Sequence, residues 1–127
     1  MPDFSDFLEV QTQTAWGRTL ADFAAFCDPE PAAHILDVGC GPGLLPAILA
    51  QKGCLSFGVD IDFALLTSHL SCSLVAADSF SLPFPAGMFD LVTAVNLLFL
   101  LTDPIRALQE MARVLKPTGQ VCLLNPA

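Results

Sequence analysis

Basic side chains are scarce in this sequence. The chain has 5 Lys and Arg against 13 Asp and Glu, which gives a formal net charge of −8. A protein that binds nucleic acid needs clustered lysine and arginine to meet the phosphates. The basic residues here are instead scattered along the chain: Arg18, Lys52, Arg106, Arg113 and Lys116. The composition therefore argues against nucleic acid as a substrate or partner.

Charge of either sign is sparse as well. Only 14% of the residues are charged, against about a quarter in typical soluble domains, whereas 54% are apolar. A chain of 127 residues is long enough for one domain with a substantial core. The low charge further predicts surface that is meant for a ligand cleft or a subunit contact.

The sequence lacks a long hydrophobic run. The longest one, Leu91 to Leu101, is interrupted by Thr93 and Asn96 and falls well short of the roughly 20 residues that span a bilayer. The first residues, 1–4, carry no basic group and begin no apolar core, so they do not resemble a signal peptide. We expect a cytoplasmic protein that does not associate with a membrane.

No C-x-x-C pair occurs among the 5 cysteines. Their odd number and irregular spacing make structural disulfides and a zinc site unfavoured interpretations. Reduced, buried thiols in a cytosolic protein explain them more simply, and we expect no metal site.

The most informative stretch that is present joins a short strand to a helix through glycines. Residues Ile35 to Val38 have the apolar character of a buried strand, and Gly39, Gly41 and Gly43 follow at every second position. An apolar run at 44–50 then opens a helix. Strand, glycine turn and helix make up a nucleotide-binding α/β unit. Glycine suits such a turn because it tolerates positive φ and lets a ligand lie against the backbone.

The charge of this turn indicates which ligand it favours. Its spacing is G-x-G-x-G and not the G-x-G-x-x-G of dinucleotide-binding proteins, and Asp37 precedes the first glycine by two residues. A pyrophosphate would be repelled by Asp37, and the turn holds no Lys or Arg to offset that repulsion. A cationic ligand is favoured instead. S-adenosylmethionine, with its sulfonium and ammonium groups, meets this requirement.

Three segments resemble one known family. Asp37-Val38-Gly39-Cys40-Gly41-Pro42-Gly43 resembles the first motif of the class I (Rossmann-like) S-adenosylmethionine-dependent methyltransferases. Residues 81–90 resemble the family's L-P-F-x-x-x-x-F-D segment, and 110–117 its E-x-x-R-V-L-K-P-G-G signature, with Thr118 replacing the first glycine of that signature. The resemblance covers about residues 34–125. It implies a methyltransferase of the small-molecule, UbiE-like group known as type 11, whose partner would be a small-molecule acceptor of unknown identity.

The resemblance implies a three-layer αβα sandwich around a parallel sheet of five strands in the order 3-2-1-4-5. We expect a single domain, residues 1–127, with an N-terminal helical cap at 1–30 and a Rossmann-like core at 31–127. The expected strands are 34–38, 55–59, 73–77, 90–95 and 120–124. The expected helices are 3–27, 44–52, 63–70 and one that starts at Asp103-Pro104 and ends at the turn 116–119, with a buried stripe of Ile105, Leu108, Ala112 and Leu115.

The family's usual C-terminal antiparallel hairpin is lacking, because its full sheet has seven strands and this chain ends after the fifth. The fifth strand would then be an exposed edge of apolar sequence, Val121 to Leu124, which favours pairing with another chain. Two hypotheses follow. Either the chain is a C-terminally truncated piece of a longer protein, or it forms a homo-oligomer through this edge.

Candidate cofactor-binding residues follow from places at the carboxyl ends of the expected strands for Asp60 and Asn96, and from the resemblance for Asp78 and Ser79. Asp60 would accept hydrogen bonds from the ribose hydroxyls, Asp78 and Ser79 would contact adenine, and Asn96 would lie near the methyl donor. The alternatives are ordinary turn residues at Asp60, Asp78 and Ser79, and a backbone-capping role for Asn96. Asp62 is expected to cap the next helix. The full set of cofactor-binding candidates is Asp37, Gly39, Cys40, Gly41, Gly43, Asp60, Ile61, Asp78, Ser79 and Asn96.

Catalytic residues cannot be assigned from the sequence. Methyl transfer is a displacement at the sulfonium methyl, in which the protein mainly supplies orientation and exclusion of water. His34 lies at the wrong end of its strand and His69 at the far end of a helix, so neither is a candidate base. Asn96-Leu97-Leu98-Phe99 lacks the two prolines of the N-P-P-aromatic motif, which argues against DNA bases or glutamine as acceptors.

Several interpretations stay open at this stage. Phe4, Phe7 and Trp16 either pack against the sheet or cover the ligand cleft, whereas residues 20–23 are expected to pack. Phe80 and Leu82 lie either on the adenine edge or on the sheet. The rival functions are a catalytically incomplete module that binds S-adenosylmethionine or serves interactions, and, less favoured, an NAD-dependent oxidoreductase.

Overall fold

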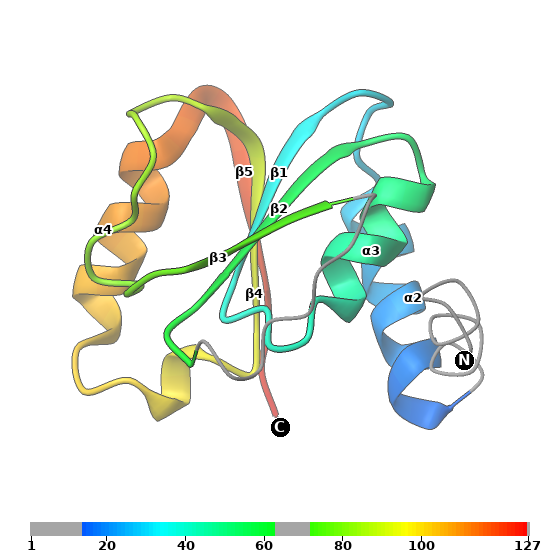
Figure 1. The fold of residues 1–127 in the computed structure, drawn as a ribbon, viewed down its shortest axis with the longest axis horizontal. Helices are drawn as coiled ribbons and strands as arrows, with labels where there is room; N and C mark the ends of the chain where they lie inside the picture. Colours follow the sequence, from blue (N-terminus) through cyan, green and yellow to red (C-terminus); the bar gives the residue numbers. More distant parts are fainter. Residues whose placement is uncertain (1–13, 63–71, 127) are drawn as a thin grey trace.

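The computed structural model describes residues 14–62 and 72–126. In this part of the chain, a parallel sheet is covered by α2 and α3 on one face and by α4 on the other (Figure 1). The helical segments are α2 (Ala15–Cys27), α3 (Leu44–Gln51), the short 3-10 helix η2 (Leu98–Leu100) and α4 (Pro104–Val114), and the strands are β1 (His34–Val38), β2 (Leu55–Asp60), β3 (Cys72–Ala76), β4 (Phe89–Val95) and β5 (Leu115–Leu124).

The sheet order β3-β2-β1-β4-β5 confirms the predicted fold. β1 pairs with β2 on one side and with β4 on the other, so Val38 lies level with both Val59 and Ala94. The strand order reverses between β1 and β4, and open α/β sheets bind ligands at the carboxyl ends of the strands beside such a reversal. The predicted helix at 63–70, His69, Phe4 and Phe7 lie outside the described residues.

The core has two halves because β1 is buried on both faces, as expected of a central parallel strand. Ile35 packs toward α2 and α3, together with Leu20, Phe23 and Leu49. Leu36 packs toward α4 with the other half of the core, in which three aromatic rings meet edge to face: Phe57, Phe84 and Phe89. The predicted packing of residues 20–23 is confirmed at Leu20 and Phe23, which are buried.

The buried stripe predicted for α4 is wrong. Ile105 is 66% exposed and Leu108 is 36% exposed, and the residues that face the sheet are Ala107, Met111 and Val114. Two apolar stripes share this helix, and hydrophobic spacing alone cannot choose between them. The stripe that is buried in the structure places the small Ala107 against the sheet. It also turns Glu110 and Arg113 toward the loop at 82–84, to which both side chains hydrogen-bond.

The predicted turn at 116–119 is also wrong in its position. β5 begins at Leu115, directly after α4, and residues 116–119 form an irregularity inside the strand. Leu115 lies opposite Phe89 and Gln120 opposite Leu91, so these four residues bulge out of the ladder. The bulge brings Lys116 close to Asp90, and Nζ of Lys116 donates a hydrogen bond to Oδ1 of Asp90 at 3.0 Å.

None of the helices in the described part of the chain is long and apolar enough to cross a membrane.

Candidate cofactor site

The glycine turn after β1 adopts the backbone conformation that its sequence predicts. Gly39, Gly41 and Gly43 all have positive φ, at 75°, 55° and 91°. The backbone N–H groups of Gly39 and Cys40 both donate to the carbonyl oxygen of Val59, at 2.8 and 2.9 Å. The turn is thereby fixed to the end of β2, and Gly43 serves as the N-cap of α3.

The space beside each glycine differs in and around this turn. A Cβ atom at Gly41 would meet nothing within 4 Å, so open space lies against that backbone. A Cβ at Gly39 would lie 2.9 Å from Cδ1 of Leu97, and one at Gly58 would lie 2.8 Å from Sγ of Cys40. Gly58 was not singled out from the sequence, because a lone glycine in a strand carries no signal of what passes over it. Cys40 is the small filler above it.

The thiol of Cys40 is not a reactive group in this fold. Burial, followed by the negative charges of Asp37 and Asp60, raises the pKa of Cys40 to about 12. The thiol therefore stays protonated at neutral pH, and a protonated thiol is a poor nucleophile.

Asp60, at the end of β2, holds the glycine turn in place. Its Oδ2 accepts a hydrogen bond from the N–H of Gly41 at 2.9 Å, and its Oδ1 accepts one from the N–H of Asp62 at 2.8 Å. A carboxylate has about four acceptor positions, so Asp60 can still accept from a ligand. Its predicted role toward ribose stays a prediction, and the structure adds a role in the turn that spacing alone did not indicate.

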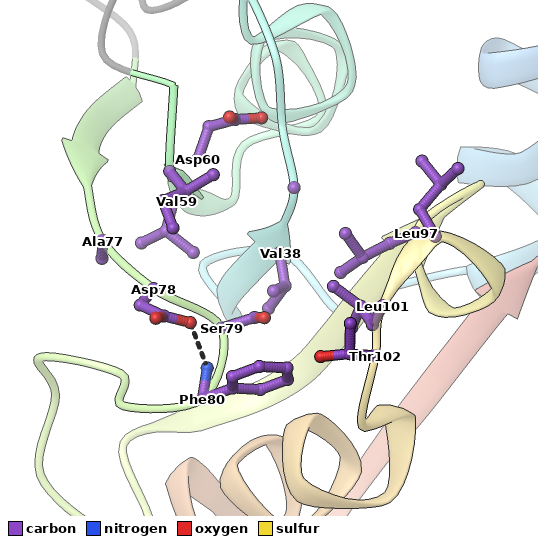
Figure 2. A pocket seen from close by; sticks show the side chains of 13 residues that line it. Val38, Val59, Asp60, Ala77, Asp78, Ser79, Phe80, Leu97, Leu101 and Thr102 are labelled. Atoms are coloured by element: carbon purple, nitrogen blue, oxygen red, sulfur yellow. Dashed lines mark hydrogen bonds between the residues drawn. The ribbon is translucent and has the colours of Figure 1, made fainter.

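A cavity of about 260 Å³ lies beyond the carboxyl ends of β1 and β2. Figure 2 shows that Asp60, Asp78 and Phe80 approach it from neighbouring strand ends, with Leu101 and Thr102 on another side. The candidates predicted from the sequence that line it are Gly39, Asp60, Ile61, Asp78 and Ser79. Other lining residues come from the segment after β4 and were not predicted, since no motif marks them: Leu97, Leu100, Leu101 and Thr102.

The part of the 260 Å³ cavity's wall that follows β3 is a tight turn. Oδ1 of Asp78 accepts a hydrogen bond from the N–H of Phe80 at 2.9 Å, and the carbonyl oxygen of Asp78 accepts one from the N–H of Ser81 at 3.0 Å. The structure places the two apolar residues here differently, although Phe80 also packs against the core and its contact with adenine stays a prediction. Phe80 lines the cavity, with the guanidinium carbon of Arg106 5.5 Å from its ring centroid, whereas Leu82 is buried in the core.

A second cavity of about 130 Å³ lies between α2 and the glycine turn. Gly39 lines both cavities, so the two adjoin at this glycine. Asp37, Cys40 and Trp16 line the smaller one, and the other described residues that line it beside Gly39 are apolar: Leu20, Pro42, Leu44, Leu45 and Val95. Each of the two cavities has an acid in its wall: Asp60 and Asp78 line the larger one, and Asp37 lines the smaller one.

Asp37 is the buried acid of this site, with only 4% of its surface exposed. Its Oδ1 accepts a hydrogen bond from Oγ1 of Thr93 at 2.8 Å. Burial raises the pKa of Asp37 to about 7, and the charge of Asp60 adds to this rise, whereas the Thr93 hydrogen bond lowers the pKa. Within the described residues, no basic side chain is among the groups that shift this pKa. A cationic ligand would stabilise the ionised carboxylate.

Three of the ten cofactor-binding candidates are not among the lining residues of either cavity: Gly41, Gly43 and Asn96. Asn96 has φ of 53° and lines neither cavity, and its N–H donates to the carbonyl oxygen of Leu124 at 2.7 Å. This backbone contact suits the capping alternative, and a side-chain role near the methyl donor stays a prediction. His34 lies at the opposite end of β1, where its N–H donates to Oδ2 of Asp90 at 2.8 Å.

A larger cavity, of about 450 Å³, lies near this opposite end of the sheet. Asp28, Glu30 and Asp90 line it, together with Thr118 and Gln120. None of the ten cofactor-binding candidates is among its lining residues. In open parallel sheets, ligands bind at the carboxyl ends of the strands. We therefore assign the site to the two smaller cavities despite their size.

Comparison with known proteins agrees with the fold and the glycine turn. The family model described as a methyltransferase domain matches residues 36–123, so the chain belongs to the methyltransferase-domain family and is of the class I, Rossmann-like type.

Curated relatives give the same result. The chain is 35% identical over 96 residues to a demethylmenaquinone methyltransferase of Corynebacterium kroppenstedtii, an alignment that covers 74% of this chain and 42% of the relative. It is 34% identical over 96 residues to a ubiquinone biosynthesis O-methyltransferase of Coxiella burnetii, with coverage of 69% and 41%. The chain thus spans about two fifths of the length of these relatives.

Among solved structures, a TehB-like S-adenosylmethionine-dependent methyltransferase from Corynebacterium glutamicum superimposes with a TM-score of 0.71 at 25% identity. The match covers 82% of this chain and 60% of that one.

Proposed function

We propose that this chain binds S-adenosylmethionine in the two adjoining cavities and is the cofactor-binding part of a methyltransferase. The observation that carries the proposal is the buried carboxyl of Asp37, beside a glycine turn whose Gly41 backbone faces open space. A carboxylate with Thr93 as its hydrogen-bond donor and no basic neighbour among the groups that act on it fits a cationic ligand.

Each part of the cofactor has a candidate partner. Asp60 would accept from the ribose hydroxyls while it holds the turn, and Asp78 with Ser79 would contact adenine. The ring of Phe80 supplies an apolar wall of the same cavity. Asp37 would face the cationic amino-acid half. When bound, the cofactor supplies a methyl group on a good leaving group, so the chain needs mainly to orient reactants and exclude water.

We further propose an apolar small molecule as the acceptor. Ile61 and Leu100, which line the cavity proposed for ribose and adenine, are 74% and 69% exposed, and exposed apolar side chains beside a cofactor site suit an apolar second ligand. One relative named above is a demethylmenaquinone methyltransferase and the other a ubiquinone biosynthesis O-methyltransferase, which supports this class. The net charge of −8 supports the absence of a nucleic-acid partner.

Two further parts of the proposal concern the protein's setting. Self-association through β5 is supported by the apolar side chains of this edge strand, Val121 and Leu123, which are 37% and 39% exposed. A cytoplasmic location is supported by the buried thiols of Cys27, Cys40 and Cys54, since reduced cysteines are typical of that compartment.

Calorimetric titration of the purified chain tests cofactor binding. We expect S-adenosylmethionine and S-adenosylhomocysteine to bind, and NADH not to bind. Binding of NADH without S-adenosylmethionine would instead favour an oxidoreductase. Methyl transfer from labelled S-adenosylmethionine to a panel of apolar acceptors then separates an enzyme from a module that only binds the cofactor.

A pair of glycine variants tests whether the ligand lies against the turn. Gly41→Ala and Gly53→Ala both add a methyl group where φ is positive and nothing lies within 4 Å. Each should lower the free energy of unfolding by about 1 kcal/mol, because L-residues disfavour this conformation. Only Gly41→Ala should reduce the calorimetric affinity for S-adenosylmethionine, by at least about tenfold. Normal binding by Gly41→Ala would show that the ligand does not lie against the turn at this glycine.

A further inference from the structure

The buried stripe of α2 continues past the sheet. Leu20, Phe23, Ala24 and Cys27 are buried on the inner face of the helix. Trp16 precedes Leu20 by four residues, about 6 Å along the helix axis, and therefore lies on the same stripe. It is nevertheless 45% exposed. Packing against the sheet explains the four buried residues and leaves the position of Trp16 unexplained.

The position of Trp16 is well defined by the start of the helix. Thr14 is the N-cap of α2, and its Oγ1 accepts a hydrogen bond from the N–H of Gly17 at 3.0 Å. Such a cap fixes where the first turn begins. Trp16 lies in that first turn and lines the cavity of about 130 Å³ together with Asp37, Gly39 and Cys40. A half-exposed indole thus shares a small cavity with a buried carboxyl group.

We infer that Trp16 is a positioning residue that covers the cationic amino-acid half of the methyl donor and favours its positive charge. This inference rests on the proposed function. A cation between a carboxylate and an aromatic face is attracted by both, by the charge of one and by the quadrupole of the other. Among the residues that the structure describes, Asp37 is the acid that lines this cavity and Trp16 is the aromatic residue of its wall.

The inference predicts an order of preference among three ligands. S-adenosylmethionine carries a sulfonium and an ammonium group, S-adenosylhomocysteine keeps only the ammonium group, and adenosine has neither. Loss of the indole should therefore weaken S-adenosylmethionine most and adenosine least. A tryptophan with a merely structural role would weaken all three ligands alike or none of them.

The composition of the chain makes contact between a ligand and Trp16 measurable by tryptophan fluorescence. Trp16 is the only tryptophan, and the chain has no tyrosine. Emission excited at wavelengths that select tryptophan therefore reports on Trp16 alone. Titration of the wild-type chain with S-adenosylmethionine or S-adenosylhomocysteine should change the intensity or wavelength of this emission, whereas adenosine should bind without changing it.

Two variants complete the test. Trp16→Phe keeps an aromatic face, and Trp16→Leu keeps an apolar side chain without one. By calorimetry, we expect Trp16→Leu to lose about three- to tenfold in affinity for S-adenosylmethionine, in line with one cation–π contact, and to keep its affinity for adenosine. Trp16→Phe should lose less. Thermal unfolding by circular dichroism checks that both variants are folded, and the wild-type emission decides the matter if Trp16→Leu is not.

The outcomes separate this inference from the proposed function. Failure of the wild-type chain to bind any of the three ligands would overturn both. If S-adenosylmethionine binds, but the emission stays constant and Trp16→Leu retains the wild-type ratio of affinities, then only the role of Trp16 is refuted.

Discussion

Asp37 is an acid whose burial opposes its ionisation. Its carboxyl group is 4% exposed, and burial raises its pKa from 3.8 to about 7. Between these two values the folded chain holds a proton that the unfolded chain has released. Stability therefore falls as the pH rises from about 4 to about 7 and changes little above that range. An acid that destabilises its own fold at neutral pH is expected where the fold serves a cationic ligand.

Replacing Asp37 should separate stability from binding. Asp37→Asn can still accept the hydrogen bond from Thr93 and has no charge to bury. At pH 8 we expect the variant to be more stable than the wild type by on the order of 3 kcal/mol, with a difference that shrinks toward zero near pH 4. Urea unfolding at several pH values measures this.

Calorimetry on the same variant should show weaker binding of S-adenosylmethionine, because the ligand loses its counter-charge. Equal stability of Asp37→Asn and wild type at pH 8 would contradict the raised pKa, and unchanged affinity would contradict the role of Asp37 toward the ligand.

At the level of elements, α4 is tied to the loop that follows β3. Oε1 of Glu110 accepts a hydrogen bond from the N–H of Leu82 at 2.8 Å. Arg113 donates to the carbonyl oxygens of Leu82 and Phe84, at 3.0 and 2.9 Å, and pairs with Glu110 at 2.6 Å. The two late motifs of the sequence, 81–90 and 110–117, thus contact each other. These contacts hold the loop at 82–84, which begins two residues after Phe80 in the cavity wall.

Removal of this tie should cost stability in a pH-dependent way. Arg113→Ala should lower the free energy of unfolding by about 1–2 kcal/mol at neutral pH, a figure reduced for the partial exposure of the pair. The Arg113 hydrogen bond lowers the pKa of Glu110 below its ordinary 4.5, so this stabilisation is present above that pH and is lost as the pH falls further. Denaturant titrations at pH 7 and pH 3 give the comparison.

Gln109→Ala is the matched control for Arg113→Ala, because Gln109 is an exposed residue of the same helix. It should unfold like the wild type at both pH values. A loss in Arg113→Ala that is no larger than the loss in Gln109→Ala would show that the tie contributes nothing to stability.

At the level of the whole molecule, the described sheet ends in two edge strands, β3 and β5. The carbonyl oxygen of Leu124 accepts from the N–H of Asn96, so the backbone groups of Leu124 face β4. Because these groups alternate along a strand, those of Leu123 face outward and are available to another chain. This edge is the surface through which we propose that the chain self-associates.

A proline at this position tests the edge. Leu123→Pro removes only the outward N–H, which an edge strand tolerates, whereas Leu123→Ala removes the side chain and keeps that N–H. In sedimentation velocity we expect the wild type and Leu123→Ala to form dimers and Leu123→Pro to be monomeric. A monomeric wild type across the accessible concentrations would refute self-association of this chain.

The sequence by itself determined the local features: the positive φ of the glycine turn, the strand before it, the helix after it and the start of α4 at Asp103-Pro104. Glycine spacing, apolar runs and caps act within a few residues, and the family resemblance supplied the order of the strands. The tertiary structure alone decided which stripe of α4 is buried. It also decided that Asp60 holds Gly41, 19 residues away, and that Arg113 holds Leu82, 31 residues away.

The same holds for the site. The acids at the strand ends could be listed from the sequence, but the adjoining of two cavities at Gly39, the place of Phe80 in a cavity wall, and the exposed position of Trp16 could not. These features depend on contacts between segments that are distant in the chain. A pattern read along the chain contains no distances between such segments, and packing sets those distances.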